Sequence, residues 1–157
     1  STLNFYVVVA VKDYKNASLS EFQKDIKSIG LYKNKAKYIK ESAKILDEKY
    51  NGKIPSSMRE LLELPGTGRK SANIILGNVY NISEGIAVDT HVARLSKLFG
   101  LTNQKDPGKI EKDLMEIIPK KDWIFFNHAM VLYGRKYCPA RHKHENCPLR
   151  EFVSSIF

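Results

Sequence analysis

The sequence predicts an all-α fold. Apolar residues recur at intervals of three and four along most of the chain, which is the spacing of an amphipathic helix, and the alternation typical of strands is nearly absent. Glycine and proline divide these periodic stretches into about eight short helices. With 157 residues and 43% hydrophobic content, the chain can bury one core, so we expect a single domain over residues 1–157.

The first three helices are delimited by glycine and asparagine. Residues 5–11 are β-prone but have no hairpin partner nearby, so we expect tertiary packing to hold them in a helix. A second helix carries apolar residues at positions 22, 26 and 29 and ends at Gly30. A third carries them from position 36 to 46 and ends at Asn51 and Gly52.

Two helices joined by a glycine-rich turn are expected over residues 57–80. Ser57 followed by Glu60 has the form of a capping box, and the helix that it opens has to stop by Pro65. The second helix of the pair runs from about Arg69 to Tyr80.

Further turn residues delimit the helices of the C-terminal half. Asp89 is well suited to cap a helix that we expect from Thr90 to Phe99. After about Tyr133 the sequence becomes a basic tail that contains cysteine and histidine. The remaining turn signals are Gly85, Gly100, Pro107, Gly108 and Pro119.

The net charge favours a polyanionic partner. The chain has 26 Lys and Arg against 17 Asp and Glu, a formal charge of +9, and nucleic acid fits this excess better than a membrane does. A lysine-rich surface is equally compatible with a solubility strategy or with a hot or salty habitat. No run reaches the roughly 18 apolar residues that span a bilayer, and the start lacks a signal-peptide pattern, so we expect an intracellular protein.

The turn at residues 64–70 has the composition of a phosphate-binding loop. Gly66 and Gly68 have no side chain and can adopt positive φ, so backbone N–H groups can approach a phosphate closely. The N-terminus of the following helix adds a favourable partial charge. The alternative is that the two glycines only close a turn between helices.

Two ordered motifs resemble a known family. Residues 64–73 read Leu-Pro-Gly-Thr-Gly-Arg-Lys-Ser-Ala-Asn, and residues 88–94 read Val-Asp-Thr-His-Val-Ala-Arg. Together with Ile-Gly-Leu-Tyr at 29–32 and Tyr-Gly-Arg at 133–135, they are similar to the endonuclease III branch of the helix-hairpin-helix (HhH-GPD) DNA glycosylase superfamily. The resemblance implies a two-lobed helical fold with a cleft between the lobes.

The resemblance also implies DNA repair chemistry at Lys70 and Asp89. In the family, the lysine at the Lys70 position attacks C1′ of a damaged nucleotide, expels the base and forms a Schiff base. The 3′ phosphate is then lost by β-elimination. The carboxylate at the Asp89 position stabilises the cationic sugar and helps proton transfer. From the residues alone, Lys70 is an ordinary phosphate contact, the commonest role of lysine in a basic hairpin, and Asp89 is a helix cap, a role that can coexist with the chemical one.

The implied partner is double-stranded DNA that contains a damaged base or an abasic site. Leu31 matches the wedge that fills the stack when the base is flipped out, with core packing as the alternative. His91 and Arg94 are candidates for phosphate or sugar contacts, with ordinary surface positions as the alternative. The other DNA-binding candidates belong to the hairpin and are Leu64, Gly66, Thr67, Gly68 and Arg69.

The chain departs from the family at its cysteines. Well-known endonuclease III proteins carry a [4Fe-4S] loop of the form Cys-x6-Cys-x2-Cys-x5-Cys. Here Cys138 fits the first ligand and Cys147 fits the third with one residue deleted, while the second is absent and Val153 stands at the fourth. Because four cysteine ligands are the usual requirement, we expect residues 134–157 to be a degenerate cluster loop without an iron–sulfur centre, and we expect no cofactor.

A zinc site is an alternative for the same tail. Cys138, His142, His144 and Cys147 supply two sulfurs and two imidazoles, which suit tetrahedral zinc, but their spacing is not that of a standard zinc finger. A decayed loop packed by its remaining side chains, a basic DNA-contacting patch and a chance cluster compete with it. We expect no metal.

The family's helices that precede Ser1 have no counterpart in the sequence. We therefore expect a fold that lacks one wall, either because the chain is a fragment or because its lineage is short. The expected function is a monomeric glycosylase with AP lyase activity on oxidised or fragmented pyrimidines. A mismatch or uracil-type glycosylase on the same fold and a non-catalytic DNA-binding module are the alternatives.

Overall fold

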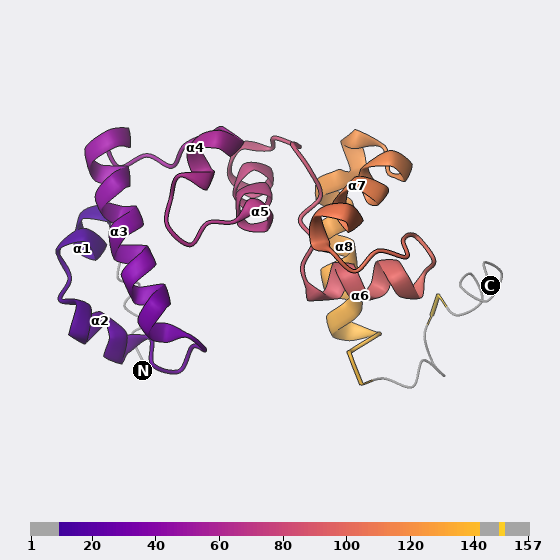
Figure 1. The fold of residues 1–157 in the computed structure, drawn as a ribbon, viewed down its shortest axis with the longest axis horizontal. Helices are drawn as coiled ribbons and strands as arrows, with labels where there is room; N and C mark the ends of the chain where they lie inside the picture. The colour runs from indigo at the N-terminus through magenta and orange to yellow at the C-terminus, as the bar shows by residue number, and fades with distance from the viewer. Residues whose placement is uncertain (1–9, 142–147, 150–157) are drawn as a thin grey trace, which may run out of the picture. The chain divides into compact units, whose positions relative to one another are not determined.

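The computed structural model describes residues 10–141 and 148–149, and every regular element within these residues is helical (Figure 1). No strand occurs in this part of the chain, so the predicted all-α class is confirmed. Residues 5–9 of the predicted first helix lie outside the described residues. The elements are α1 (Val11–Asn16), α2 (Leu19–Asp25), α3 (Tyr32–Tyr50), α4 (Met58–Leu62), α5 (Arg69–Tyr80), α6 (Thr90–Leu98), α7 (Pro107–Ile117), the 3₁₀ turn η1 (Lys120–Asp122) and α8 (Trp123–Lys136).

The chain forms two compact units, Ser1–Gly68 and Arg69–Phe157. The division falls within the predicted helix pair of residues 57–80, between its turn and its second helix. Two units agree with the two lobes that we expect. The assignment of residues 1–157 to one domain with a tail from residue 134 stays a prediction, although Gly134 to Lys136 still belong to α8. In the described residues, no helix combines the length and the apolar character that crossing a membrane requires.

In the first unit, α1 and α2 both pack against α3 (Figure 1). Neither short helix has a buried residue, whereas α3 buries Ala36 and Ala43, which lie on one face of the helix. Lys40 of α3 donates hydrogen bonds to the carbonyl oxygens of Lys15, at 2.6 Å, and Ala17, at 2.5 Å. These bonds satisfy the C-terminal end of α1, where a cation also stabilises the helix dipole.

The ends of α2 and α3 differ in how well the turn residues predict them. The helix α3 ends at Tyr50, and Asn51 and Gly52 after it have φ of 51° and 74°, as the turn signal indicates. The helix α2 ends at Asp25 rather than at Gly30. The reason is that the Lys27 and Ile29 N–H groups bond three residues back, which replaces the helix with consecutive tight turns.

Half of the predicted capping box forms at the start of α4. The Ser57 hydroxyl oxygen accepts a hydrogen bond from the Glu60 N–H at 3.3 Å. The Glu60 carboxylate accepts from the Ser57 hydroxyl at 2.6 Å. The helix ends at Leu62, ahead of Pro65.

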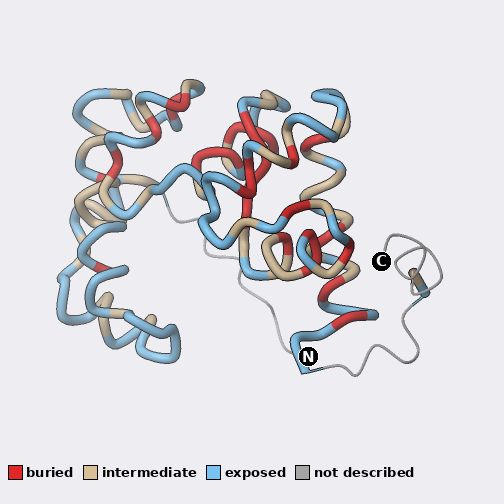
Figure 2. The backbone as a smooth tube through the Cα atoms, turned by 45° about the vertical axis from the view of Figure 1, so that its right-hand side comes forward, coloured by how far each residue is buried: buried red, intermediate tan, exposed pale blue. Residues whose placement is uncertain are grey.

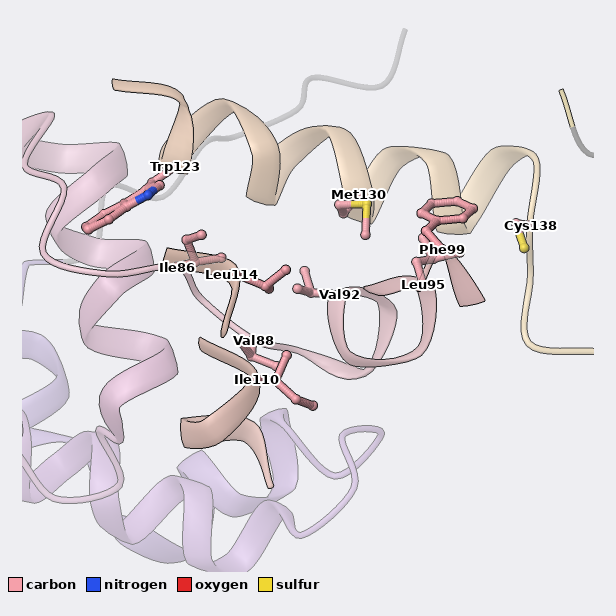
Figure 3. Close-up of a cluster of buried hydrophobic side chains, with 10 residues drawn as sticks. All are labelled: Ile86, Val88, Val92, Leu95, Phe99, Ile110, Leu114, Trp123, Met130 and Cys138. Atoms are coloured by element: carbon pink, nitrogen blue, oxygen red, sulfur yellow. The ribbon is translucent and has the colours of Figure 1, made fainter. Parts of the chain in front are cut away.

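The second unit contains a hydrophobic core between α6, α7 and α8 (Figure 3). The Trp123 indole N–H at the start of α8 donates to the Ile118 carbonyl at 2.8 Å, so its polar atom is satisfied. Residues 85–88, which lead into Asp89, are all buried. Figure 2 marks the buried stretches of the backbone in red. The core side chains are Ile86, Val88, Val92, Leu95, Phe99, Ile110, Leu114, Trp123, Met130 and Cys138.

Candidate functional site

The hairpin turn is a hydrogen-bonded β-turn shaped by Pro65 and Gly66. The Thr67 N–H donates to the Leu64 carbonyl at 3.0 Å, which leaves Pro65 and Gly66 at the two central positions. Gly66 has a φ of 77°, and with proline before it this gives a type II turn. A Cβ on Gly66 would lie 2.7 Å from Cδ2 of Tyr38 on α3, so both the conformation and the packing require glycine.

Leu64 and Gly68 have opposite surroundings. Leu64 is 5% exposed, its N–H donates to the Leu61 carbonyl and its carbonyl accepts from Thr67, so the residue anchors the turn and its contact with DNA stays a prediction. Ser42 of α3 supports the same turn, because its hydroxyl donates to the Pro65 carbonyl at 3.1 Å. At Gly68 the φ is ordinary, and no described atom lies within 4 Å of where a Cβ would stand. The described fold therefore does not require glycine at position 68.

Lys70 is the second residue of α5, and its side chain is exposed. Within the described part of the chain its ammonium group makes no hydrogen bond or ion pair. The carboxylate that Arg69 contacts, Glu111, is committed to Arg69 and Asn73. The Lys70 amine is therefore available for a ligand.

Asp89 caps α6, as predicted. Its Oδ1 accepts a hydrogen bond from the Val92 N–H at 2.8 Å, and its backbone has the extended conformation of an N-cap residue. The side chain is half-buried, and the buried segment 85–88 holds the residue from the other side. The carboxylate is thus fixed in orientation, and it belongs to the same compact unit as Lys70.

Arg69, the first residue of α5, joins a network with α7. Its Nε donates to Oε2 of Glu111 at 2.6 Å, and Nδ2 of Asn73 donates to Oε1 of the same carboxylate at 2.9 Å. The hydrogen bond to the Glu111 carboxylate holds the pKa of Arg69 above its ordinary value. These contacts give Arg69 a structural role, and its contact with DNA stays a prediction.

Glu111 is absent from the candidates that the sequence indicates. Its position is the signal that could have found it, because Ile110, Glu111 and Leu114 share the buried face of α7. A carboxylate therefore stands where an amphipathic helix ordinarily carries an apolar residue. Its partners are 42 and 38 positions away in the sequence, and no local pattern indicates them.

Leu31 stands at the N-cap of α3 in the left-handed conformation, with φ 59° and ψ 30°. This conformation costs a non-glycine residue roughly 1–2 kcal/mol. The side chain is nonetheless 78% exposed, so burial of Leu31 does not offset the strain. The core-packing alternative does not fit that exposure, and the wedge stays a prediction.

Arg94 and His91 contact α8 and the residues after it. Arg94 donates from Nη2 to the Cys138 carbonyl at 2.5 Å and from Nη1 to Cys138 Sγ at 3.5 Å. His91 lies against Gly134, where a Cβ would be 2.5 Å from the His91 Nδ1, and this buried nitrogen has no partner in the described residues. Both side chains are half-buried, so their contacts with DNA stay predictions.

Cys138 is a core residue, fully buried beside Arg94. The other candidate zinc ligands, His142, His144 and Cys147, lie outside the described residues, as does Val153. Within residues 10–141 and 148–149, no three His, Cys, Asp or Glu side chains form a group that could hold a metal ion. A cluster held by four thiolates does not fit a sequence with two cysteines, so no chemical step below involves one.

Comparisons with the sequences of known proteins match most of the chain. A family model described as HhH-GPD superfamily base excision DNA repair protein matches residues 2–120. Endonuclease III of Bacillus subtilis (strain 168) is 44% identical over 140 residues, which are 88% of this chain and 64% of that protein. Endonuclease III of Synechocystis sp. (strain ATCC 27184 / PCC 6803 / Kazusa) is 45% identical over 121 residues, or 77% of this chain and 55% of that protein. The chain therefore spans less than two thirds of the length of these relatives.

Solved structures match the fold as well. A trapped endonuclease III–DNA covalent intermediate, in an estranged-adenine complex, has a TM-score of 0.84 and 40% identity, and the match covers 94% of this chain and 72% of that chain. A thermostable thymine-DNA glycosylase has a TM-score of 0.73 and 25% identity, with 89% and 66% covered. The helical fold expected from the sequence motifs is thereby confirmed.

Proposed function

The chain belongs to the HhH-GPD superfamily of base excision DNA repair proteins, and we propose that it is a DNA glycosylase with AP lyase activity of the endonuclease III type. Its substrate is double-stranded DNA with an oxidised or fragmented pyrimidine, or with an abasic site. The names of its relatives and the DNA-bound structures that it matches support this proposal. The protein acts as a monomer and inside the cell, where this substrate is found.

Lys70 is the nucleophile in this proposal. Its neutral amine attacks C1′, the C1′–N bond to the base breaks, and the base leaves with the electron pair and takes up a proton. The nitrogen then loses a proton, its lone pair forms the C1′=N bond as the C1′–O4′ bond opens, and O4′ takes a proton, which gives a Schiff base. Removal of a C2′ proton expels the 3′ phosphate. The observation that carries this assignment is the exposed amine on the first turn of α5, without an ion pair in the described residues.

Asp89 assists the reaction through Oδ2, the carboxylate oxygen that does not cap α6. Oδ1 is committed to the Val92 N–H, whereas Oδ2 has no hydrogen-bond partner in the described residues. A carboxylate held in one orientation can stabilise the cationic sugar as the base leaves, because it needs no reorganisation at that moment. It can also accept or return a proton.

The turn, the wedge and the surface charge bind the DNA. The backbone N–H groups of Gly66 and Gly68 take a phosphate, because that of Thr67 is committed to the Leu64 carbonyl, and the open space at Gly68 supports this assignment. Leu31 fills the stack after the damaged nucleotide leaves it. Arg69, His91 and Arg94 are additional contacts, and the net charge of +9 supports binding to a polyanion.

A mismatch or uracil-type glycosylase is the second candidate. The match to a thymine-DNA glycosylase, with 25% identity, supports it, and the Lys70 and Asp89 arrangement is compatible with either substrate class. A non-catalytic DNA-binding module is the remaining alternative.

Product analysis on three duplexes separates these functions. The duplexes contain thymine glycol, uracil opposite guanine, and thymine opposite guanine, and released bases and cleaved strands are resolved separately. We expect base release and β-elimination with thymine glycol, and neither product with Lys70→Ala. Release of uracil or thymine alone would favour the second candidate. Tight binding with no product from any duplex would contradict both enzymatic functions.

A further inference from the structure

The buried carboxylate of Glu111 is hydrogen-bonded to the first turn of α5, which carries Lys70. Arg69 and Asn73 are four residues apart, so they lie on one face of α5. Oε2 of Glu111 accepts from Arg69 at 2.6 Å, and Oε1 accepts from Asn73 at 2.9 Å. Lys70 lies between these two anchor points along the chain. A single side chain of α7 thus fixes both ends of the first turn of α5.

The surroundings of Glu111 leave it little freedom to move. The residue is 5% exposed. A Cβ on Gly85 would lie 2.0 Å from Glu111 Oε1, 2.8 Å from Asn73 Nδ2 and 3.2 Å from Arg69 Nη2. Backbone therefore covers the network on the side of Gly85. A buried carboxylate without partners is strongly unfavourable. The hydrogen bonds from Arg69 and Asn73 therefore restrict the position of Glu111, and the same bonds restrict Arg69 and Asn73.

Asn73 is oriented for this contact and for no other in the described residues. A carboxylate only accepts hydrogen bonds, so the amide nitrogen of Asn73 has to face Glu111. This orientation leaves Oδ1 of Asn73 buried and without a partner in the described part of the chain. A buried acceptor without a partner is destabilising. The presence of Asn73 here is therefore best explained by the hydrogen bond that its amide nitrogen donates to Glu111.

We propose that Glu111 is a positioning residue for Lys70, which it serves by clamping the first turn of α5 through Arg69 and Asn73. The inference rests on the proposed function, because it gives Lys70 a reaction to perform. The first turn of a helix lacks part of its backbone hydrogen bonding and frays readily. Attack on C1′ requires the amine at about 3–3.5 Å in the correct direction, so fraying lowers the rate of attack.

The clamp acts on chemistry more than on affinity. Glu111 is buried, and its charge is matched by Arg69, so it presents no anionic group to DNA. Removing the clamp loosens one side chain that reacts and leaves the turn at residues 64–68 unchanged. We therefore expect the rate of Schiff-base formation to fall while the affinity for DNA is nearly preserved.

The test compares Glu111→Gln with Glu116→Gln on the same helix. Glu116 is exposed and makes no ion pair in the described residues, so it is a matched control for loss of one carboxylate from α7. Three quantities are measured: the single-turnover rate of borohydride trapping on abasic-site DNA, the Kd for a tetrahydrofuran-site duplex, and the melting temperature. For Glu111→Gln we expect trapping to slow by about 10- to 100-fold, with Kd within about threefold of the parent. The control should match the parent.

Asn73→Ala provides a second, milder variant if Glu111→Gln does not fold. It removes one arm of the clamp and keeps the Arg69 ion pair, so we expect a smaller loss of rate. Where both single variants fold, the double variant should lose less than the product of the two single losses, because both changes break one unit.

The outcomes distinguish the two proposals. If the parent chain forms no trapped complex, the proposed function fails and the clamp with it. If the parent is trapped and Glu111→Gln is trapped equally fast, the clamp alone is wrong. The same holds for Asn73→Ala where Glu111→Gln does not fold. A lower fraction of active protein with an unchanged rate, or a loss confined to Kd, would likewise overturn it.

Discussion

The two carboxylate oxygens of Asp89 have different roles: one makes the structural contact, and the other is left for the proposed chemistry. Oδ1 accepts the Val92 N–H that starts α6, and in the described residues Oδ2 has no hydrogen-bond partner. A substitution that keeps one acceptor oxygen should therefore preserve the helix and remove the charge. This gives a way to test the reaction without disturbing the fold.

Asp89→Asn should keep the cap and lose the activity, whereas Asp89→Ala should lose both. We expect the alanine variant to be destabilised by about 1 kcal/mol and the asparagine variant to be nearly as stable as the parent. Both should release the base about 10²- to 10⁴-fold more slowly. Thermal melts and single-turnover base release measure the two effects. Parental activity in Asp89→Asn would show that the residue is only a cap.

Leu31→Gly should leave stability almost unchanged and slow excision. Glycine removes the left-handed strain of roughly 1–2 kcal/mol, and its own entropic penalty of about 0.5–1 kcal/mol offsets part of that gain. The wedge side chain, 78% exposed, is lost at the same time. Unfolding by urea and excision from a thymine-glycol duplex are the measurements. A variant that excises at the parental rate would exclude the wedge.

For single residues, the sequence predicts the local role of a residue better than it predicts which distant residues it contacts. The capping role of Asp89 follows from its place before an apolar helix, and the structure has that cap. The sequence presents Arg94 and His91 as DNA-contact or surface candidates, yet both are half-buried against α8 or Cys138. Such contacts join residues up to 44 positions apart, and no local spacing encodes them.

The two glycines of the hairpin turn should respond differently to replacement by alanine. Gly66→Ala should destabilise the protein by more than about 1 kcal/mol, because alanine resists positive φ and its Cβ would meet Tyr38 at 2.7 Å. Gly68→Ala should change stability by less than about 0.5 kcal/mol, because its Cβ enters open space. It should nevertheless weaken DNA binding, since the methyl group blocks a phosphate. Melting curves and Kd for an abasic-analogue duplex check both; parental affinity in Gly68→Ala would contradict the phosphate site.

The contact between α1 and α3 should depend on pH. Lys15 bonds Asp47 at 2.7 Å, and this hydrogen bond holds the pKa of Asp47 below its ordinary value of 3.8. A group with a lowered folded pKa contributes stability that is fully present above its unfolded pKa and is lost as pH falls through the folded value. Asp47→Asn should therefore be less stable than the parent at neutral pH, with a difference that shrinks as pH falls from about 5 to about 2. Urea unfolding at low salt across this range measures the difference, because urea does not screen the charges, and a constant difference would contradict the ion pair.

Elements with a strong local pattern could be predicted closely. The helix from Arg69 to Tyr80 and the start of the next at Thr90 agree with the structure, because apolar periodicity and the capping residue act within a few positions. The end of α2 could not be predicted, since three-residue backbone bonds replace the helix before its glycine is reached. The burial of Glu111 depends on α5 and α7 meeting, which is a tertiary event.

For the whole molecule, the second compact unit holds the residues proposed for the chemistry. Lys70, Asp89 and the Arg69–Glu111 pair all belong to Arg69–Phe157, which also contains the hydrophobic core of Figure 3. The proposed phosphate loop and Leu31 belong to Ser1–Gly68. The phosphate loop and the wedge are thus assigned to one unit and the reacting residues to the other, so variants of these two groups should have separable effects on affinity and on rate.

The most direct measurement is identification of the amino group that reacts with DNA. The chain is incubated with abasic-site duplex and borohydride, the adduct is digested, and the modified peptide is sequenced by mass spectrometry. If Lys70 is the nucleophile, one adduct forms, on Nζ of Lys70, and none forms with Lys70→Ala. An adduct on another lysine or on the N-terminal amine, or no adduct from the parent chain, would contradict it.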